Sequence, residues 1–313
     1  MRKVSIIITT HSRPHLLPRA IESARLSGRD IEIVVVDDAS TDGTRELCGA
    51  VPGIRYVRVE HNRRVAGARN IGLAASAGEY VSFLDDDDER LPDSVDRQVE
   101  CLEAEPRAGM IYGQALVVDQ RGAPTRRLYP LSCPQGDIFW ALLGQNFIPC
   151  GSVVFRRSCL RRVGLLDEAV PGVDDWDLWV RVAECFPVIA VERPVLKWRQ
   201  SSPGSGQGSS AAAELVRLSV RQFRARWMRL GRAARAPDDL RRKAWRTFSS
   251  GMASHLVCEA ARAQAEGHSL HAAGNLFTAL CLLPLAVLRL PFDGPRTRAL
   301  LNRVGSIRGT KAV

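Results

Sequence analysis

Short apolar runs alternate with segments of helical spacing in the N-terminal part of the chain, and this alternation limits the fold more than any other feature. The runs are rich in Val, Ile, Tyr and Phe, the residue types that favour strands. They cover residues 4–10, 31–36, 54–59 and 80–84. Strands that alternate with helices predict a parallel sheet with helices packed on it. The sequence therefore predicts an α/β fold, and ligands of such folds bind at the carboxyl ends of the strands.

Polar side chains stand at the ends of three of these predicted strands. Thr9 lies near the end of the first, Asp37 and Asp38 follow the second, and four consecutive aspartates, residues 85–88, follow the fourth. Four like charges behind a buried strand are costly unless protonation, arginines or a divalent cation relieve their repulsion. A solvated acidic loop is the alternative. We expect the three clusters to converge on one crevice.

The aspartate pair after the second strand and an arginine farther along the chain each allow two interpretations. Asp37 and Asp38 could accept hydrogen bonds from a uracil or a ribose, or they could cap the following helix. Arg69 lies in the sequence between the two acidic clusters. Its guanidinium could balance the carboxylates or contact a base or phosphate, and a surface salt bridge is the alternative.

A second acidic site lies far along the chain, where residues 174–179 read Asp-Asp-Trp-Asp-Leu-Trp. The spacing of Trp176 and the apolar residues after it predicts a helix with one face in the core. Asp174 and Asp175 then stand at the helix N-terminus, where the dipole favours negative charge. Helix capping explains one acid well, but it explains two acids and two tryptophans less well.

The C-terminal third carries the excess of positive charge. The chain has a net charge of +10, and residues 211–313 hold 18 Lys+Arg against 6 Asp+Glu. Residues 201–210 read as a flexible linker or loop, which separates a domain at 1–200 from a basic helical region at 211–313. Such a region could meet anionic lipid or nucleic acid, but aromatic residues are not interleaved in it as stacking platforms. The uncharged stretch 272–288 contains a proline and favours a packed or interfacial helix over a membrane span.

Taken together, the motifs resemble family 2 glycosyltransferases with the GT-A fold. The matching runs are VSIIITTHSRPHLLPRAIES, EIVVVDDASTDGT, AGARNIGLAASAGEYVSFLDDDDERLP, GSVVFRRSCLRRVGLLDE and VDDWDLWVRVAE. The resemblance implies an inverting transfer of a sugar from a nucleoside diphosphate, most often UDP, to an acceptor hydroxyl. It implies a GT-A domain (a Rossmann-like nucleotide-diphospho-sugar transferase fold) followed by the helical C-terminal region.

The resemblance also assigns residues on the donor side. It implies a divalent metal, Mn²⁺ or Mg²⁺, held by Asp85 and Asp87, with Asp87 the more direct ligand. The positions that it assigns to the donor and its nucleotide are Thr9, Asp37, Asp38, Arg69, Asp85 and Asp86.

On the acceptor side, Asp175 matches the catalytic base of the family, Asp174 replaces a usual glutamate, and Trp176 lines the site. Many members carry a late histidine that contacts metal or diphosphate, and Ser201 stands in its place here. Arg199 is the candidate for a diphosphate contact instead.

The partners that follow are a nucleotide-sugar donor, a saccharide or lipid-linked acceptor, and an anionic membrane surface met peripherally, with no nucleic acid. We expect a cytoplasmic enzyme of polysaccharide or glycoconjugate synthesis, at the inner face of the cytoplasmic membrane where the tail meets lipid. A different class stays open: a non-catalytic nucleotide-sugar-binding or scaffold protein that docks through its basic tail.

Overall fold

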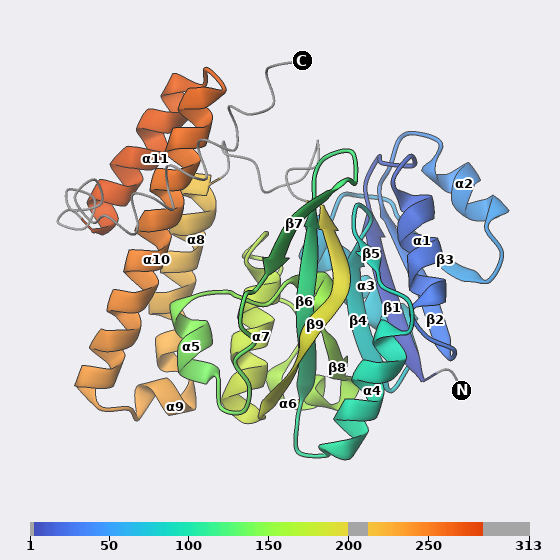
Figure 1. Ribbon diagram of the computed structural model, residues 1–313, viewed down its shortest axis with the longest axis horizontal. Helices are drawn as coiled ribbons and strands as arrows, with labels where there is room; N and C mark the ends of the chain where they lie inside the picture. Colours follow the sequence, from blue (N-terminus) through green and yellow to red (C-terminus); the bar gives the residue numbers. More distant parts are fainter. Residues whose placement is uncertain (1–2, 200–211, 284–313) are drawn as a thin grey trace. The chain divides into compact units, whose positions relative to one another are not determined.

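The computed structural model describes residues 3–199 and 212–283 of the chain (Figure 1). The chain divides into two compact units. One comprises Met1–Leu142 with Asn146–Gly204, and the other comprises Leu143–Gln145 with Ser205–Val313. The linker predicted at residues 201–210, with Ser201, lies outside the described residues.

The first unit is built on a nine-stranded sheet in the order β3-β2-β1-β4-β8-β6-β9-β5, with β7 paired to β6. The four N-terminal strands are parallel, as the sequence predicts, because each apolar run is followed by a helix that returns the chain. They are β1 (Val4–Thr10), β2 (Ile31–Asp38), β3 (Ile54–Val59) and β4 (Tyr80–Asp85).

The rest of the sheet is mixed. The short strand β8 runs antiparallel to β4 and β6, whereas the long strand β9 runs parallel to β6. The pairing of β9 brings the chain back beside the acidic turn that follows β4. These strands are β5 (Glu89–Arg90), β6 (Met110–Val118), β7 (Pro124–Tyr129), β8 (Val154–Arg156) and β9 (Val188–Arg199).

Helices cover both faces of the sheet. On one face, Ile6 and Ile8 of β1 share a core with apolar residues of α1 (Leu17–Leu26) and α4 (Ser94–Ala104). On the other face, α3 (Arg64–Ala75) lies close to β1, since a side chain at Gly72 would collide with Ile7. The remaining helices of this unit are α2 (Thr44–Ala50), most of α5 (Phe139–Gly144), α6 (Leu160–Val163), α7 (Asp174–Cys185) and the 3-10 turns Cys150–Ser152 and Arg157–Cys159.

The second unit is helical over its described residues, as predicted for the basic region. Helix α11 (Ser269–Leu282) packs on α10 (Asp238–Ala265) and α8 (Ala212–Ala225), and α9 (Gly231–Ala234) follows a 3-10 turn at Trp227–Arg229. Aromatic rings of Phe223, Trp227 and Phe248 form part of its core. Among the described residues, we find no helix long and apolar enough to cross a membrane.

Candidate active site

The sheet brings the polar strand ends together, as the sequence predicts. In the register of the parallel strands, Thr9 pairs with Asp85, and Thr10 pairs with Asp37. These residues come from three different strands, β1, β2 and β4, that lie side by side. The backbone positions of these residues are therefore fixed by the hydrogen bonding of the sheet.

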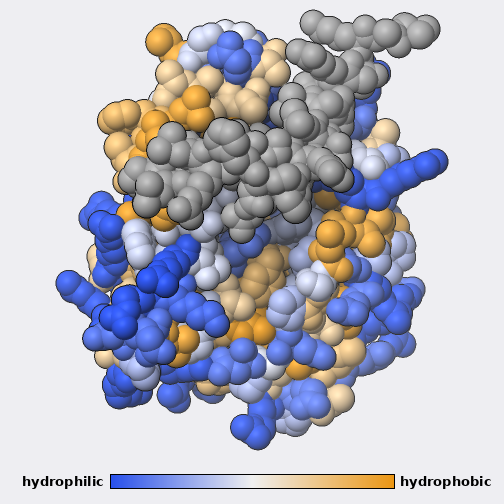
Figure 2. Space-filling view, turned by 60° about the vertical axis from the view of Figure 1, so that its left-hand side comes forward, coloured by the Kyte–Doolittle hydropathy of each residue, from blue (hydrophilic) through white to orange (hydrophobic). Residues whose placement is uncertain are grey.

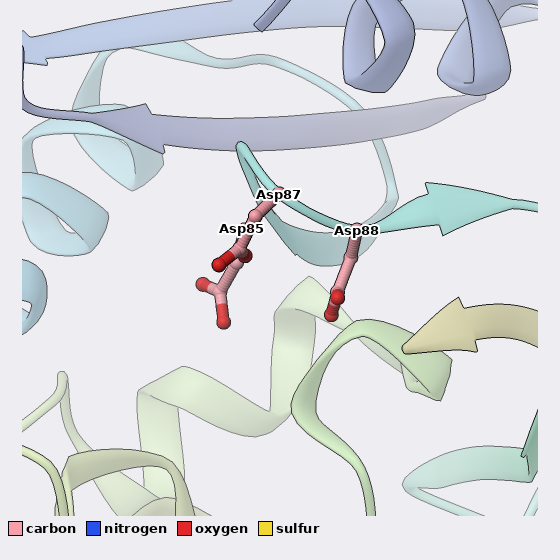
Figure 3. Close-up of side chains that lie close together, drawn as sticks. All are labelled: Asp85, Asp87 and Asp88. Carbon is pink, nitrogen blue, oxygen red and sulfur yellow. The ribbon is translucent and has the colours of Figure 1, made fainter. Parts of the chain in front are cut away.

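Three aspartates of the turn after β4 form a candidate metal site. Carboxylate oxygens of Asp85, Asp87 and Asp88 all lie within 4.8 Å of one another, and Figure 3 shows the three side chains on the same side of the turn. The turn is closed by a hydrogen bond from the Asp88 amide to the Asp85 carbonyl, at 3.1 Å. Carboxylate oxygens are the donors that Mg²⁺ and Mn²⁺ prefer, so the donor set fits such an ion.

Asp88 is the member of this group that the sequence assignment misses. It is buried and accepts a hydrogen bond from the amide of Arg199 at 2.9 Å. Burial, together with the charges of Asp87 and Asp85, raises the pKa of Asp88. A cation shared by the three groups would relieve this repulsion. The acidic run itself was visible in the sequence, but the turn that carries Asp88 round to Asp85 was not.

Asp86 does not belong to that group. Its side chain is fully buried, accepts a hydrogen bond from the Thr10 hydroxyl at 2.6 Å and forms an ion pair with Arg13. Burial raises the pKa of Asp86 to about 7, against the opposing charge of Arg13. Arg13 also bonds Asp87, at 3.0 Å. The donor contact expected for Asp86 stays a prediction, while its bonds in the structure tie the acidic turn to β1.

Arg69 joins the two acidic clusters of the sequence. Its Nη2 donates to Asp85 at 2.7 Å and its Nη1 donates to Asp174 at 2.9 Å, although 105 residues separate Arg69 from Asp174. The guanidinium is buried and lies over the ring of Phe83, 5.3 Å from the ring centre. These contacts agree with the interpretation that Arg69 balances the charge of the carboxylates. The nucleotide contact stays a prediction.

The second cluster occupies the N-terminus of α7, as the sequence predicts. Asp174 is buried and also accepts from the amide of Gly172 at 3.1 Å, while Asp175 is only partly buried. Burial, with the charge of Asp174 next in size, raises the pKa of Asp175 to about 7. The third acid of the motif, Asp177, is paired with Arg181 in its own helix at 2.7 Å. Asp175 is thus the carboxylate of this cluster with partial exposure and with a pKa suited to accepting a proton near neutrality.

Asp37 and Asp38 differ in their surroundings. Asp37 is fully buried and accepts from the Ser40 amide at 2.9 Å, the Tyr56 hydroxyl at 2.6 Å and Arg58 at 3.1 Å. Although burial opposes it, these bonds lower the pKa of Asp37. Asp38 accepts from the Arg63 amide at 2.7 Å, and burial raises its pKa. Asp37 already has donors for both oxygens, so Asp38 is the better placed of the two for an added ligand.

Two other predicted site residues are also held by the protein. Arg199 donates from Nε to the Asp87 carbonyl at 3.0 Å and from Nη1 to the Gln120 carbonyl at 3.0 Å. Trp176 is buried and donates from its indole to the Leu142 carbonyl at 2.7 Å. These hydrogen bonds hold both side chains in place, and the predicted diphosphate and acceptor contacts of these residues stay predictions.

Comparison with known proteins agrees with this architecture. The model of Glycosyl transferase family 2 matches residues 5–164, about half of the chain. An uncharacterized glycosyltransferase of Rickettsia felis is 32% identical over 211 residues, which are 64% of this chain and 35% of that protein. The glucosyltransferase WfaP of Escherichia coli is 27% identical over 187 residues, 58% of this chain and 70% of its own length. The chain thus spans about a third of the length of the first relative.

Solved structures share the fold at low sequence identity. The mannosyltransferase PcManGT of Pyrobaculum calidifontis, in complex with GDP-Man and Mn²⁺, gives a TM-score of 0.58 at 23% identity, covering 97% of this chain and 86% of that one. TarS 1-349 of S. aureus, in complex with UDP-GlcNAc, gives 0.54 at 14% identity, covering 88% and 90%. The mixed sheet and its helices define a GT-A-like fold. The chain belongs to glycosyl transferase family 2.

Proposed function

We propose that this protein transfers a sugar from a nucleoside diphosphate, most simply UDP, to an acceptor hydroxyl with inversion at the anomeric carbon. The observation that supports it most is the Arg69 bridge, which holds Asp85 of the metal group and Asp174 of the base cluster on one guanidinium. This bridge supports a single site in which one carboxylate group would serve the leaving group and the other would take up a proton. The WfaP name records UDP-Glc as its donor, which favours a UDP-sugar here.

We assign the roles in this proposal as follows. Asp85, Asp87 and Asp88 would hold a divalent metal, which when bound neutralises the charge that builds up on the departing diphosphate. Asp175 would accept the proton of the acceptor hydroxyl, a poor nucleophile while protonated. Asp174, fixed by Arg69 and by the Gly172 amide, would orient the start of α7 and so the base. Inversion requires the base and the leaving group to lie on opposite sides of the sugar.

The acceptor is proposed by comparison. The name of WfaP describes an acceptor on diphosphoundecaprenol, a sugar carried by a lipid. We propose the same class of acceptor for this chain, a lipid-linked saccharide used in polysaccharide or glycoconjugate assembly.

A donor panel tests the proposal. We expect one nucleotide sugar, with Mn²⁺, to raise the unfolding temperature more than the others, because a ligand stabilises the folded state by RT ln(1 + [L]/Kd). Chelation by EDTA is expected to remove most of that shift. With the same donor and a lipid-linked acceptor, the enzyme should yield a product of inverted anomeric configuration, which NMR can determine. Donor binding without transfer or hydrolysis would instead support the non-catalytic, nucleotide-sugar-binding alternative.

The pH dependence of transfer is a separate prediction. Asp175 acts as a base only when deprotonated, and its pKa of about 7 in the metal-free protein places the acid limb of the rate near neutrality. We therefore expect the rate to rise with pH through one ionisation and then level off. Bound metal adds positive charge nearby, so the midpoint in the metal complex should lie at or below this value. A rate that falls as pH rises over the same range would contradict Asp175 as the base.

A further inference from the structure

Exposed apolar side chains gather on one helix of the second unit. Of the large hydrophobic residues that are exposed in the described part of the chain, four lie on α11. They are Leu270 (89% exposed), Leu276 (40%), Phe277 (66%) and Leu280 (39%). The three others, Leu26, Leu131 and Leu165, stand apart in the first unit. A cluster of this kind marks an interaction surface more often than single exposed leucines do.

These four residues define the outer face of α11, and in the described part of the chain none of them belongs to the packed apolar clusters of the helical unit. The inward face of the helix carries Ala272, Asn275, Thr278 and Ala279, which are buried against α8 and α10. Along its whole length α11 has no Asp, Glu, Lys or Arg. A helix that is uncharged and apolar on its outer side is costly to leave in water, so we expect a partner to cover that side.

The helical unit that carries this apolar face has an excess of positive charge. The described part of the unit, residues 212–283, contains 12 Lys+Arg and 5 Asp+Glu, and the chain after it, residues 284–313, contains 6 and 1. One of these arginines contacts α11 on its inward face, since Arg217 of α8 donates to the Thr278 hydroxyl at 3.2 Å. In Figure 2, apolar surface gathers at the upper left, in the part of the molecule where Figure 1 draws α11.

Charge selects between the occupants of such a face. A second copy of this unit would bring an equal excess of positive charge, and like charges oppose association. The surface of an anionic bilayer offers the opposite charge together with an apolar layer into which Leu and Phe side chains can enter. We propose that the outer face of α11 inserts into the interface of an anionic membrane, with the arginines of the unit contacting lipid headgroups. This inference does not depend on sugar transfer.

Vesicle binding tests the proposal with the full-length chain. We expect co-sedimentation with vesicles of phosphatidylcholine and phosphatidylglycerol, and much weaker binding to phosphatidylcholine alone or in high salt, since salt screens the charges. The double variant Phe277→Gln with Leu280→Gln should lower the partition coefficient by about tenfold or more, because both side chains lose their apolar transfer energy. The matched control is Leu131→Gln with Leu165→Gln, two exposed leucines of the first unit, which should bind as the wild type does.

Three outcomes would overturn the proposal. Equal vesicle binding by both double variants would show that α11 does not enter the bilayer. A concentration-dependent dimer, seen by analytical ultracentrifugation without lipid and lost only in the α11 variant, would assign the face to a second copy. A lower unfolding temperature of the α11 variant without lipid would show that the chain itself covers the face. A failure of sugar transfer with vesicle binding intact would count against the proposed function alone.

Discussion

Replacing Asp175 by Asn is expected to lower the rate of sugar transfer by about 10²–10⁴-fold, the contribution of a well-placed general base. The amide has the shape of the carboxylate, and its oxygen can still accept the hydrogen bond that the Asp175 side chain takes from the Trp176 amide, at 2.6 Å. It cannot take a proton from the acceptor hydroxyl. Donor affinity should be unchanged, because the metal group at Asp85, Asp87 and Asp88 is intact.

The measurement is single-turnover transfer from the cognate donor, with donor affinity determined in parallel by calorimetry. Glu184→Gln, a carboxylate-to-amide change near the other end of α7, is the matched control and should leave both quantities near wild type. The acid limb of the pH–rate profile should also disappear in Asp175→Asn. Near wild-type turnover, or a loss of donor binding equal to the loss of rate, would assign Asp175 another role.

The parts of the fold that the sequence predicts are those encoded locally. The runs that form β1, β2, β3 and β4 are apolar over their own length and are followed by helical patterns. The sequence therefore predicts both the strands and their alternation with helices. The proximity of the acidic and hydroxyl residues at the strand ends can then be predicted, because the carboxyl ends of parallel strands share one edge of a sheet.

What the sequence could not predict depends on pairs distant along the chain. The Arg69–Asp174 ion pair spans 105 residues, and the bond from the Arg199 amide to Asp88 spans 111. The long strand β9 is interrupted by charged residues and by Pro194, so its alternation is weak, and its pairing with β6 and β5 defines it. Arg13 gave no signal of its own, since nothing near it in sequence indicates that it contacts Asp86 and Asp87.

The Arg69 bridge gives the largest expected effect on stability. Arg69→Met removes the cation from two carboxylates, of which Asp174 is 2% exposed and Asp85 is 33% exposed at the side chain. Removing one partner of a buried ion pair costs about 3–5 kcal/mol, and the partial exposure of Asp85 favours the lower end. That is a large share of the roughly 5–15 kcal/mol that holds a typical domain folded. Urea unfolding at about pH 7 measures the free energy of unfolding directly.

The charge mechanism predicts how that loss depends on pH. Burial already raises the pKa of Asp174 against the opposing charge of Arg69, and removal of Arg69 should raise it further. A group whose pKa is raised in the folded state favours folding when protonated and opposes it as pH rises through that pKa, so the deficit of Arg69→Met should shrink as the pH is lowered from neutrality. Asp174→Asn, added to Arg69→Met, should recover part of the stability at neutral pH because it removes the unpaired buried charge.

The matched control is Arg63→Met, which breaks an exposed pair with Glu168 at the start of the same helix and should cost at most about 1 kcal/mol. A deficit in Arg69→Met that is independent of pH would point to lost packing on Phe83 instead of unpaired charge.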